Sequence, residues 1–176
     1  MIPRTFALML VWAALSLGGC ASTSEWRTTL HEQLPLLGHR NWIVIADSAY
    51  PSQTRAGITT IHTGTDQLTV VKAVLEELGK TRHVKPTILL DAELQTVPES
   101  DARRITAYRH DLKALLGDRA SQSLPHMEII KKLDASAELF HVLILKTDLA
   151  LPYTSVFLEL DCGYWDAEAE KRMRSK

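Results

Sequence analysis

The sequence predicts a single layered α/β/α domain with a mainly parallel β-sheet. Helical and strand-like segments alternate after residue 28, and two short apolar runs, at 42–46 and 86–90, are each followed by an aspartate. Runs of this kind are typical of strands that are covered on both faces. Helices that alternate with such strands favour a parallel sheet between two helical layers.

The first half of the domain is expected to contain two helices and three strands. Ser24 can cap a helix that ends at Gly38, and Asp66 can cap a second helix that ends at Gly79. In both segments the leucines and valines recur at helical spacing. The strands are expected at 42–46, 58–62 and 86–90.

The second half begins with a strongly helical stretch, 99–116, which ends at Gly117. Pro125 precedes a brief apolar run at 127–130, and a helix then continues to about residue 140. The last two strands are expected at 142–145 and 156–160. The domain would then span residues 28–165, with a charged tail at 166–176 that forms a frayed helix.

Two aspartates stand directly after predicted strands. Asp47 follows the run 42–46, and Asp91 follows the run 86–90. In open α/β sheets, ligands bind beyond the carboxyl ends of the strands. This edge of the sheet is therefore the expected place for a site.

The N-terminus has the pattern of an export signal. Arg4 supplies a positive charge, residues 6–17 are apolar apart from Ser16, and Gly18 and Gly19 precede Cys20. The apolar run is too short to span a bilayer and suits a signal peptide over residues 1–19. Cys20 would then carry a lipid, with residues 20–27 as a tether. The alternative is ordinary secretion with an incidental cysteine.

This pattern also predicts where the protein resides. With no aspartate after Cys20, we expect a lipid-anchored protein on a bacterial membrane, at the periplasmic side of the outer membrane. Removing 19 of the 176 residues leaves about one domain. Once Cys20 is lipidated, Cys162 has no thiol partner, so stability must come from packing rather than from an internal disulfide.

The composition argues against several classes of function. The charges balance at 20 basic and 21 acidic side chains, without a basic patch, so nucleic acid is not an expected partner. The histidines have no metal-ligand spacing, and the glycines do not form a phosphate-binding pattern. We therefore expect neither a metal nor a cofactor.

Two segments carry a resemblance to a known family. Residues 34–51 contain a leucine-rich stretch, Gly-His, a polar pair, an apolar strand, Asp47, and a proline four residues beyond it. This order resembles the N-terminal signature of the D-ribose pyranase / L-fucose mutarotase family. Residues 146–148 and 152–156 resemble that family's Thr-Gly-Glu segment and the Tyr-x-Asn before its last strand. Tyr108-Arg109 resembles a helix of the fucose branch.

The resemblance implies a sugar mutarotase. The family interconverts anomers and ring forms of free monosaccharides, such as ribose or fucose, by proton transfer alone. It needs acid–base groups on both sides of the anomeric centre and no cofactor. The expected partner is thus a free monosaccharide. Family members assemble as rings in which a neighbouring subunit completes the site, so a homo-oligomer is expected.

The resemblance also implies roles for individual residues. His39 matches the catalytic histidine, Asp47 the aspartate that binds sugar hydroxyls or orients the histidine, and Tyr153 the tyrosine at the anomeric end. Substrate-binding positions fall at Ser155, Asp148 and Arg109. Without the family, His39 could simply favour the carbonyls at a helix end, Tyr153 could pack at an edge, and Arg109 could make a surface ion pair.

Three departures from the family leave a second hypothesis open. Ser155 stands where the family has asparagine, and Thr147-Asp148 replaces Gly-Glu. In an ungapped alignment the family's second histidine falls at Ile130, although His126 is near. The alternative is a non-catalytic sugar-binding or structural lipoprotein on the same fold.

Overall fold

The computed structural model describes residues 22–175, so the predicted signal peptide and Cys20 lie outside the described residues. In chain order the elements are α1 (Ser22–Gln33), the 3-10 turn η1 (Leu34–Leu36), β1 (Trp42–Ala46), β2 (Ile58–His62), α2 (Gln67–Lys80), β3 (Val84–Asp91), the 3-10 turn η2 (Ala92–Gln95), α3 (Ile105–Leu116), β4 (Ser121–Leu124), α4 (His126–Ser136), β5 (Val142–Lys146), β6 (Val156–Cys162) and α5 (Ala167–Arg174). Within the described part of the chain, no helix is long and apolar enough to cross a membrane.

Six strands form one sheet in the order β2-β5-β1-β6-β3-β4. The β2–β5, β5–β1 and β3–β4 pairs are parallel, whereas β6 runs antiparallel to both of its neighbours. Five strands therefore share one direction, and their carboxyl ends lie along one edge of the sheet. This confirms the predicted α/β class and the mainly parallel sheet.

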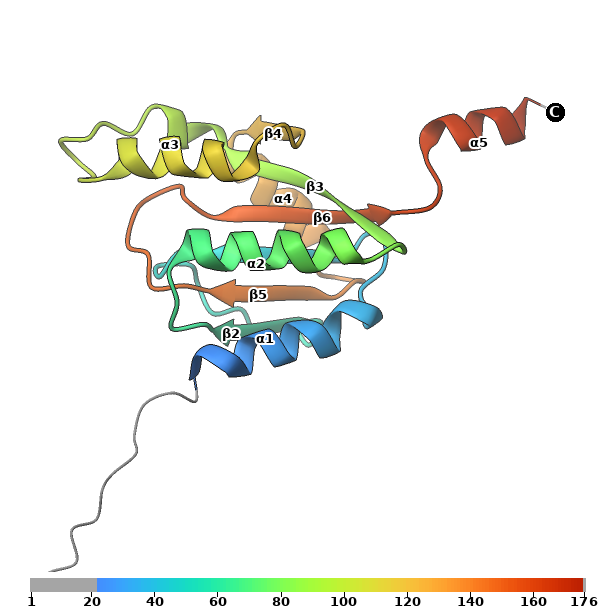
Figure 1. Ribbon diagram of the computed structural model, residues 1–176, viewed down its shortest axis with the longest axis horizontal. Helices are drawn as coiled ribbons and strands as arrows, with labels where there is room; N and C mark the ends of the chain where they lie inside the picture. Colours follow the sequence, from blue (N-terminus) through green and yellow to red (C-terminus); the bar gives the residue numbers. More distant parts are fainter. Residues whose placement is uncertain (1–21, 176) are drawn as a thin grey trace, which may run out of the picture.

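Helices cover both faces of the sheet (Figure 1). α1, α2 and α3 pack on one face and α4 packs on the other. Because successive side chains of a strand point to opposite faces, β1 sends Ile43 and Ile45 into the first core and Trp42 and Val44 into the second. Each fully buried side chain of this kind contributes about 1.5–3 kcal/mol. Burial on both faces explains why residues 42–46 are apolar throughout.

Several predicted boundaries are confirmed and others are corrected. β1 and β2 have the predicted bounds, and Asp66 caps α2 by accepting a hydrogen bond from the backbone N–H of Thr69 (3.2 Å). Gly79 does not end α2, which continues to Lys80. At the other end of the chain, α1 begins at Ser22, so part of the expected tether is helical, and Trp26 is buried.

The region from 99 to 130 differs most from the prediction. Residues 99–104 are not part of α3, because the carboxylate of Glu99 accepts hydrogen bonds from the backbone N–H groups of Arg104 and Thr106. The apolar run 127–130 belongs to α4 and not to a separate segment. β4 at Ser121–Leu124, an exposed polar strand at the sheet edge, is not predicted at all.

The charged tail contains α5, which projects away from the sheet (Figure 1). The chain turns outward at Gly163, whose backbone N–H donates to the carbonyl of His83 (2.9 Å). A Cβ at Gly163 would lie 2.6 Å from the carbonyl oxygen of Arg82, so only glycine fits this close approach. Asp166 caps α5 through the backbone N–H of Ala169, and no residue of α5 is buried.

Candidate active site

A cavity of about 520 Å³ lies at the carboxyl edge of the parallel strands. Its walls come from the segment after β1, the end of β3, the start of α4 and the turn before β6. The lining residues are Asp47, Ala49, Tyr50, Pro51, Gln53, Asp91, His126, Met127, Ile130, Asp134, Pro152 and Tyr153. The size falls within the range of about 300–1,000 Å³ that is common for small-molecule sites.

Asp47 is held by two neighbouring segments. Ser155 donates its hydroxyl to Asp47 Oδ2 (2.8 Å), and the backbone N–H of Ala49 donates to Oδ1 (2.8 Å). The backbone N–H of Asp47 in turn donates to Ser155 Oγ (3.3 Å). These bonds fix the Asp47 carboxylate at the rim of the cavity, where its remaining lone pairs can accept hydrogen bonds.

His126 is the first residue of α4. Its backbone N–H donates to both carboxylate oxygens of Glu93 (3.1 and 3.0 Å), which satisfies a donor that the helix leaves open. Its Nδ1 lies 3.1 Å from Asp91 Oδ1, and its ring meets Tyr153 edge-on, with centroids 5.6 Å apart and an interplanar angle of 77°. Backbone and ring are therefore both held in place.

Asp91 ends β3 and is only 1% exposed. Apart from the close approach of His126 Nδ1, neither carboxylate oxygen has a polar partner among the described residues, and that approach is not a well-aligned hydrogen bond. Burial raises the pKa of the Asp91 carboxyl, nearby Glu93 and Asp47 raise it further, and His126 lowers it. Asp91 and His126 thus depend on each other electrostatically.

Tyr153 occupies the turn before β6 with a left-handed backbone, at φ 58°. This conformation is uncommon for a residue with a Cβ, and it turns the ring toward His126. The side chain is 40% exposed at the mouth of the cavity. Strain of this kind is often found where function needs a particular side-chain direction.

A buried network fixes the turn from behind. The hydroxyl of Tyr108 donates to the carbonyl of Thr154 (2.7 Å), and Gln67 Nε2 donates both to that carbonyl and to the Tyr108 hydroxyl (3.0 Å). Thr147 Oγ1 completes the network by donating to Gln67 Oε1 (3.0 Å). Desolvation raises the pKa of Tyr108, so its hydroxyl remains a donor. α2, α3 and the residue that follows β5 together therefore position the turn that contains Tyr153 and Ser155.

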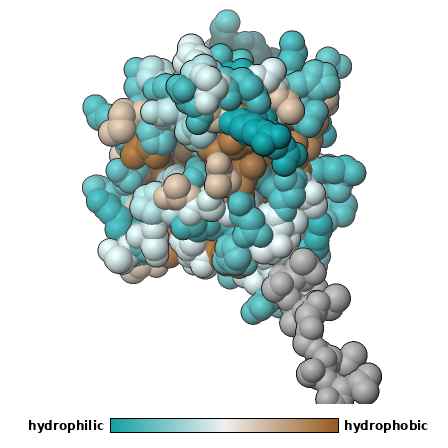
Figure 2. All heavy atoms as spheres, turned by 90° about the vertical axis from the view of Figure 1, so that its left-hand side faces the viewer, coloured by the Kyte–Doolittle hydropathy of each residue, from teal (hydrophilic) through white to brown (hydrophobic). Residues whose placement is uncertain are grey.

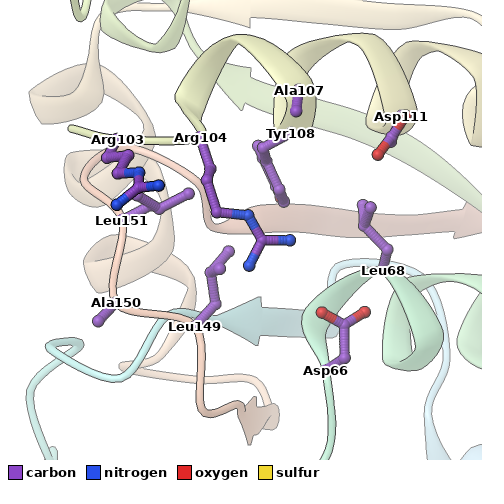
Figure 3. A pocket seen from close by; sticks show the side chains of 10 residues that line it. All are labelled: Asp66, Leu68, Arg103, Arg104, Ala107, Tyr108, Asp111, Leu149, Ala150 and Leu151. Atoms are coloured by element: carbon purple, nitrogen blue, oxygen red, sulfur yellow. The ribbon is translucent and has the colours of Figure 1, made fainter. Parts of the chain in front are cut away.

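A smaller cavity of about 300 Å³ lies on the other side of the same loop (Figure 3). Leu149 and Leu151 line it, and the side chain of Arg104 extends across it between α3 and α2. Figure 2 looks onto this edge of the molecule, where apolar side chains form a band between hydrophilic rims. The loop from residue 148 to 153 thus separates two hollows, and only the larger one contains His126 and Asp91.

The structure brings together Asp47, Tyr153 and Ser155 of the predicted residues, but it places His39 elsewhere. His39 is exposed and precedes β1, whereas Asp47 follows it. β1 alone, from Trp42 to Ala46, separates them by roughly 13 Å at about 3.3 Å per residue. Arg40, next to His39, donates its backbone N–H to the carbonyl of Leu160 (2.8 Å), near the end of β6 that lies farthest from Asp47. Within one chain, His39 and Asp47 therefore lie at opposite ends of β1, and His39 is at the amino ends of the parallel strands.

Asp148 and Arg109 do not line the larger cavity. Asp148 Oδ1 lies 2.8 Å from Nε2 of His62, and both side chains are exposed. Arg109 donates to the carbonyls of Leu94 (3.0 Å) and Val97 (2.9 Å), so it braces the segment that follows Glu93. In one chain, its contacts are structural.

The sequence alone indicates His126 and Asp91 only weakly. Asp91 stands out as a residue that follows a predicted strand, and His126 as a neighbour of the expected histidine position. The available signals were a buried-type strand that ends in aspartate and a histidine directly after a proline at the start of a helix. Among the described residues, no cluster of three or more His, Cys, Asp or Glu side chains could hold a metal ion.

Comparison with protein-family models gives no match, and neither does comparison with curated protein sequences. Solved structures do match. Bacillus subtilis RbsD in complex with D-ribose is 20% identical, with a TM-score of 0.54 over 76% of this chain and 92% of RbsD. FucU from Bifidobacterium longum is also 20% identical, with a TM-score of 0.51 over 76% of this chain and 94% of FucU. The chain therefore shares the fold of RbsD and FucU.

Proposed function

We propose that this chain is a monosaccharide mutarotase that interconverts anomers or ring forms of a free sugar such as ribose or fucose. The observation that carries the proposal is the placement of Asp47, His126 and Tyr153 around one cavity at the carboxyl edge of the sheet. The shared fold with RbsD, which is known in complex with D-ribose, supports the same assignment.

The reaction requires proton transfer at two sugar oxygens. A base removes the proton of the anomeric hydroxyl while an acid protonates the ring oxygen, so the bond from the anomeric carbon to the ring oxygen breaks and an aldehyde forms. Rotation and reclosure, with the proton transfers reversed, give the other anomer or ring size. Imidazole suits this role because its unperturbed pKa of about 6.5 allows both directions near neutral pH.

In this proposal each polar group has a role. His126 exchanges a proton at one sugar oxygen, Tyr153 hydrogen-bonds at the anomeric end, and Asp47 accepts bonds from ring hydroxyls. His39 serves on the opposite side of the sugar, and its distance from Asp47 within one chain means that a neighbouring copy supplies it. A homo-oligomer is therefore part of the proposal, as is attachment to the membrane through a lipid on Cys20.

Saturation-transfer NMR on free sugars tests the proposal. The purified protein is mixed with ribose, fucose and other monosaccharides, and exchange between anomers is compared with buffer alone. We expect accelerated exchange that falls about 10²-fold or more in His126→Asn, consistent with the usual contribution of general acid–base catalysis. His110→Asn, a change at an exposed histidine on α3, serves as the matched control. A folded, assembled protein that accelerates no sugar in the panel would exclude a mutarotase for those sugars.

A second candidate is a sugar-binding lipoprotein without catalysis. It is favoured by Ser155, whose hydroxyl is shorter than an asparagine amide and already donates to Asp47. It is also favoured by Asp148, which is paired with His62. Saturation-difference signals from a bound sugar without faster exchange would support this candidate. Mass spectrometry of the membrane fraction, beside a Cys20→Ser variant, tests the lipid anchor separately.

A further inference from the structure

We propose that Asp91 is a positioning residue that holds His126 in one tautomer, with Nδ1 protonated and Nε2 open to the cavity as the proton acceptor. The inference rests on the proposed function only for its catalytic consequence. The geometry of the pair does not depend on the proposed function. It follows from the 3.1 Å distance between His126 Nδ1 and Asp91 Oδ1, from the burial of Asp91 and the partial exposure of His126, and from the position of both residues in the cavity wall.

The two ring nitrogens of His126 are in different surroundings. Nδ1 is buried and lies 3.1 Å from Asp91 Oδ1. The His126 side chain is nevertheless 33% exposed and lines the cavity, which leaves Nε2 as the nitrogen that a bound molecule can reach. A carboxylate next to one imidazole nitrogen selects the tautomer that carries its proton there.

Apart from His126, no described residue donates a hydrogen bond that would offset the cost of burying the Asp91 carboxylate. It is 1% exposed, and no backbone N–H or hydroxyl of the described residues donates to either oxygen. A buried carboxylate without donors is costly, so the N–H of His126 Nδ1 is the contact that makes a charged Asp91 tolerable. A purely structural aspartate at a strand end would instead be expected to cap backbone groups, as Glu93 does for His126.

The remaining contacts prevent His126 from turning away. Glu93 accepts the backbone N–H of His126, and the edge-on Tyr153 ring limits rotation of the imidazole. A sugar that donates its anomeric O–H to Nε2 would lose that proton to the imidazole while the acid on the opposite side of the sugar protonates the ring oxygen, and Nδ1–H would keep facing Asp91 Oδ1. The imidazolium formed is stabilised by the carboxylate, and reclosure of the sugar returns the proton. No atom is oxidised or reduced.

Long-range ¹H–¹⁵N NMR of the purified protein tests the tautomer directly. We expect His126 to carry its proton on Nδ1 in the wild type and to become a mixture of tautomers in Asp91→Asn. Asp111→Asn, which breaks an exposed His–Asp contact of 3.0 Å on α3, should leave His126 unchanged. A wild-type signal for protonated Nε2, or a tautomer that does not respond to Asp91→Asn, would overturn the proposal.

Exchange kinetics test the consequence. In Asp91→Asn we expect kcat to fall at least tenfold with KM within about threefold, because the base is mispositioned and sugar contacts remain. A fall of less than twofold in an active protein would overturn the positioning role. If no sugar is exchanged but the tautomer behaves as expected, the pair stands and the mutarotase assignment fails. Asp91→Ala provides a second variant, and its folding is checked in the same spectra.

The pH profile gives a readout that a merely structural residue would not move. The titratable groups that face the pair are Glu93 from η2, Asp47 from the end of β1, Tyr50 and Tyr153 from the two loops, and Asp134 from α4. Asp91→Asn removes the charge that faces the imidazolium formed in the reaction while these groups stay in place. The lower limb of the rate profile should therefore move to lower pH in Asp91→Asn, and an unmoved limb would contradict the proposal.

Discussion

Replacing Tyr108 with phenylalanine tests whether the buried network behind the Tyr153 turn stabilises the domain. The Tyr108 hydroxyl donates to the Thr154 carbonyl (2.7 Å) and accepts from Gln67 Nε2 (3.0 Å). In the phenylalanine variant the Thr154 carbonyl keeps its bond from Gln67, but one N–H of Gln67 loses its acceptor. Gln67 is fully buried, so water cannot replace that acceptor without a rearrangement.

The expected cost follows from that single unpaired donor. Leaving a buried polar group unsatisfied costs about 1–3 kcal/mol, and we expect the free energy of unfolding to fall by that amount. For a chain of this size each kcal/mol corresponds to a fall in Tm of about 2–4 °C. Urea unfolding followed by circular dichroism measures the change, which should appear in the midpoint and not in the m-value.

Tyr50→Phe is the matched control. Tyr50 and Tyr108 are each 6% exposed, but among the described residues the Tyr50 hydroxyl has only a long contact of 3.5 Å with Gln53 Nε2. Its removal should cost less than about 0.5 kcal/mol, because no buried donor is left unpaired. If Tyr108→Phe costs no more than Tyr50→Phe, the network does not have the stabilising role assigned to it.

Changes at four further positions have defined outcomes in the same unfolding assay. Gly163→Ala places a Cβ 2.6 Å from the Arg82 carbonyl and should cost about 1–3 kcal/mol, whereas Gly79→Ala meets open space in α2 and should gain about 0.5–1 kcal/mol. Tyr153→Gly should be more stable than Tyr153→Ala by about 1 kcal/mol, since both lose the ring and only alanine keeps a Cβ at φ 58°. Burial raises the pKa of Asp91, so the folded state keeps the Asp91 proton to higher pH than the unfolded state does. The burial of Asp91 therefore costs no stability below about pH 4, and the free energy of unfolding falls as pH rises from there through the folded pKa. Asp91→Asn should therefore gain stability relative to the wild type as pH rises through that window, and a difference that is independent of pH would contradict the assignment.

Much of the fold could be predicted because central strands such as β1 and β5 are buried on both faces. The run 42–46 is apolar throughout and becomes β1, and Asp66 caps α2 as its sequence position suggests. The stretch from Glu99 to Arg104 differs from the predicted helix for a physical reason. Its residues favour a helix, but the Glu99 carboxylate binds the first backbone N–H groups of α3 and so ends up outside the helix.

The sequence also indicates half of the candidate site. Asp47, Tyr153 and Ser155 lie in short segments next to β1 and β6, two adjacent strands, so local patterns locate them together. The resemblance to a mutarotase assigns His39 to the same site, yet in one chain it lies at the other edge of the sheet. In the proposed assembly a neighbouring copy supplies His39, and such a contact leaves no trace in the periodicity of a single sequence.

The pairing of Asp91 with His126 depends on β4, a strand that the sequence pattern does not predict. β4 consists of Ser-Gln-Ser-Leu, and its first three residues are exposed, so it has neither an apolar run nor an alternation that predicts a strand. Yet β4 pairs with β3 in a register that sets Leu124 beside Asp91. His126 follows two residues later, after Pro125 has turned the chain into α4. The register of a polar edge strand therefore decides whether the imidazole reaches the carboxylate, and a one-residue slip would separate them.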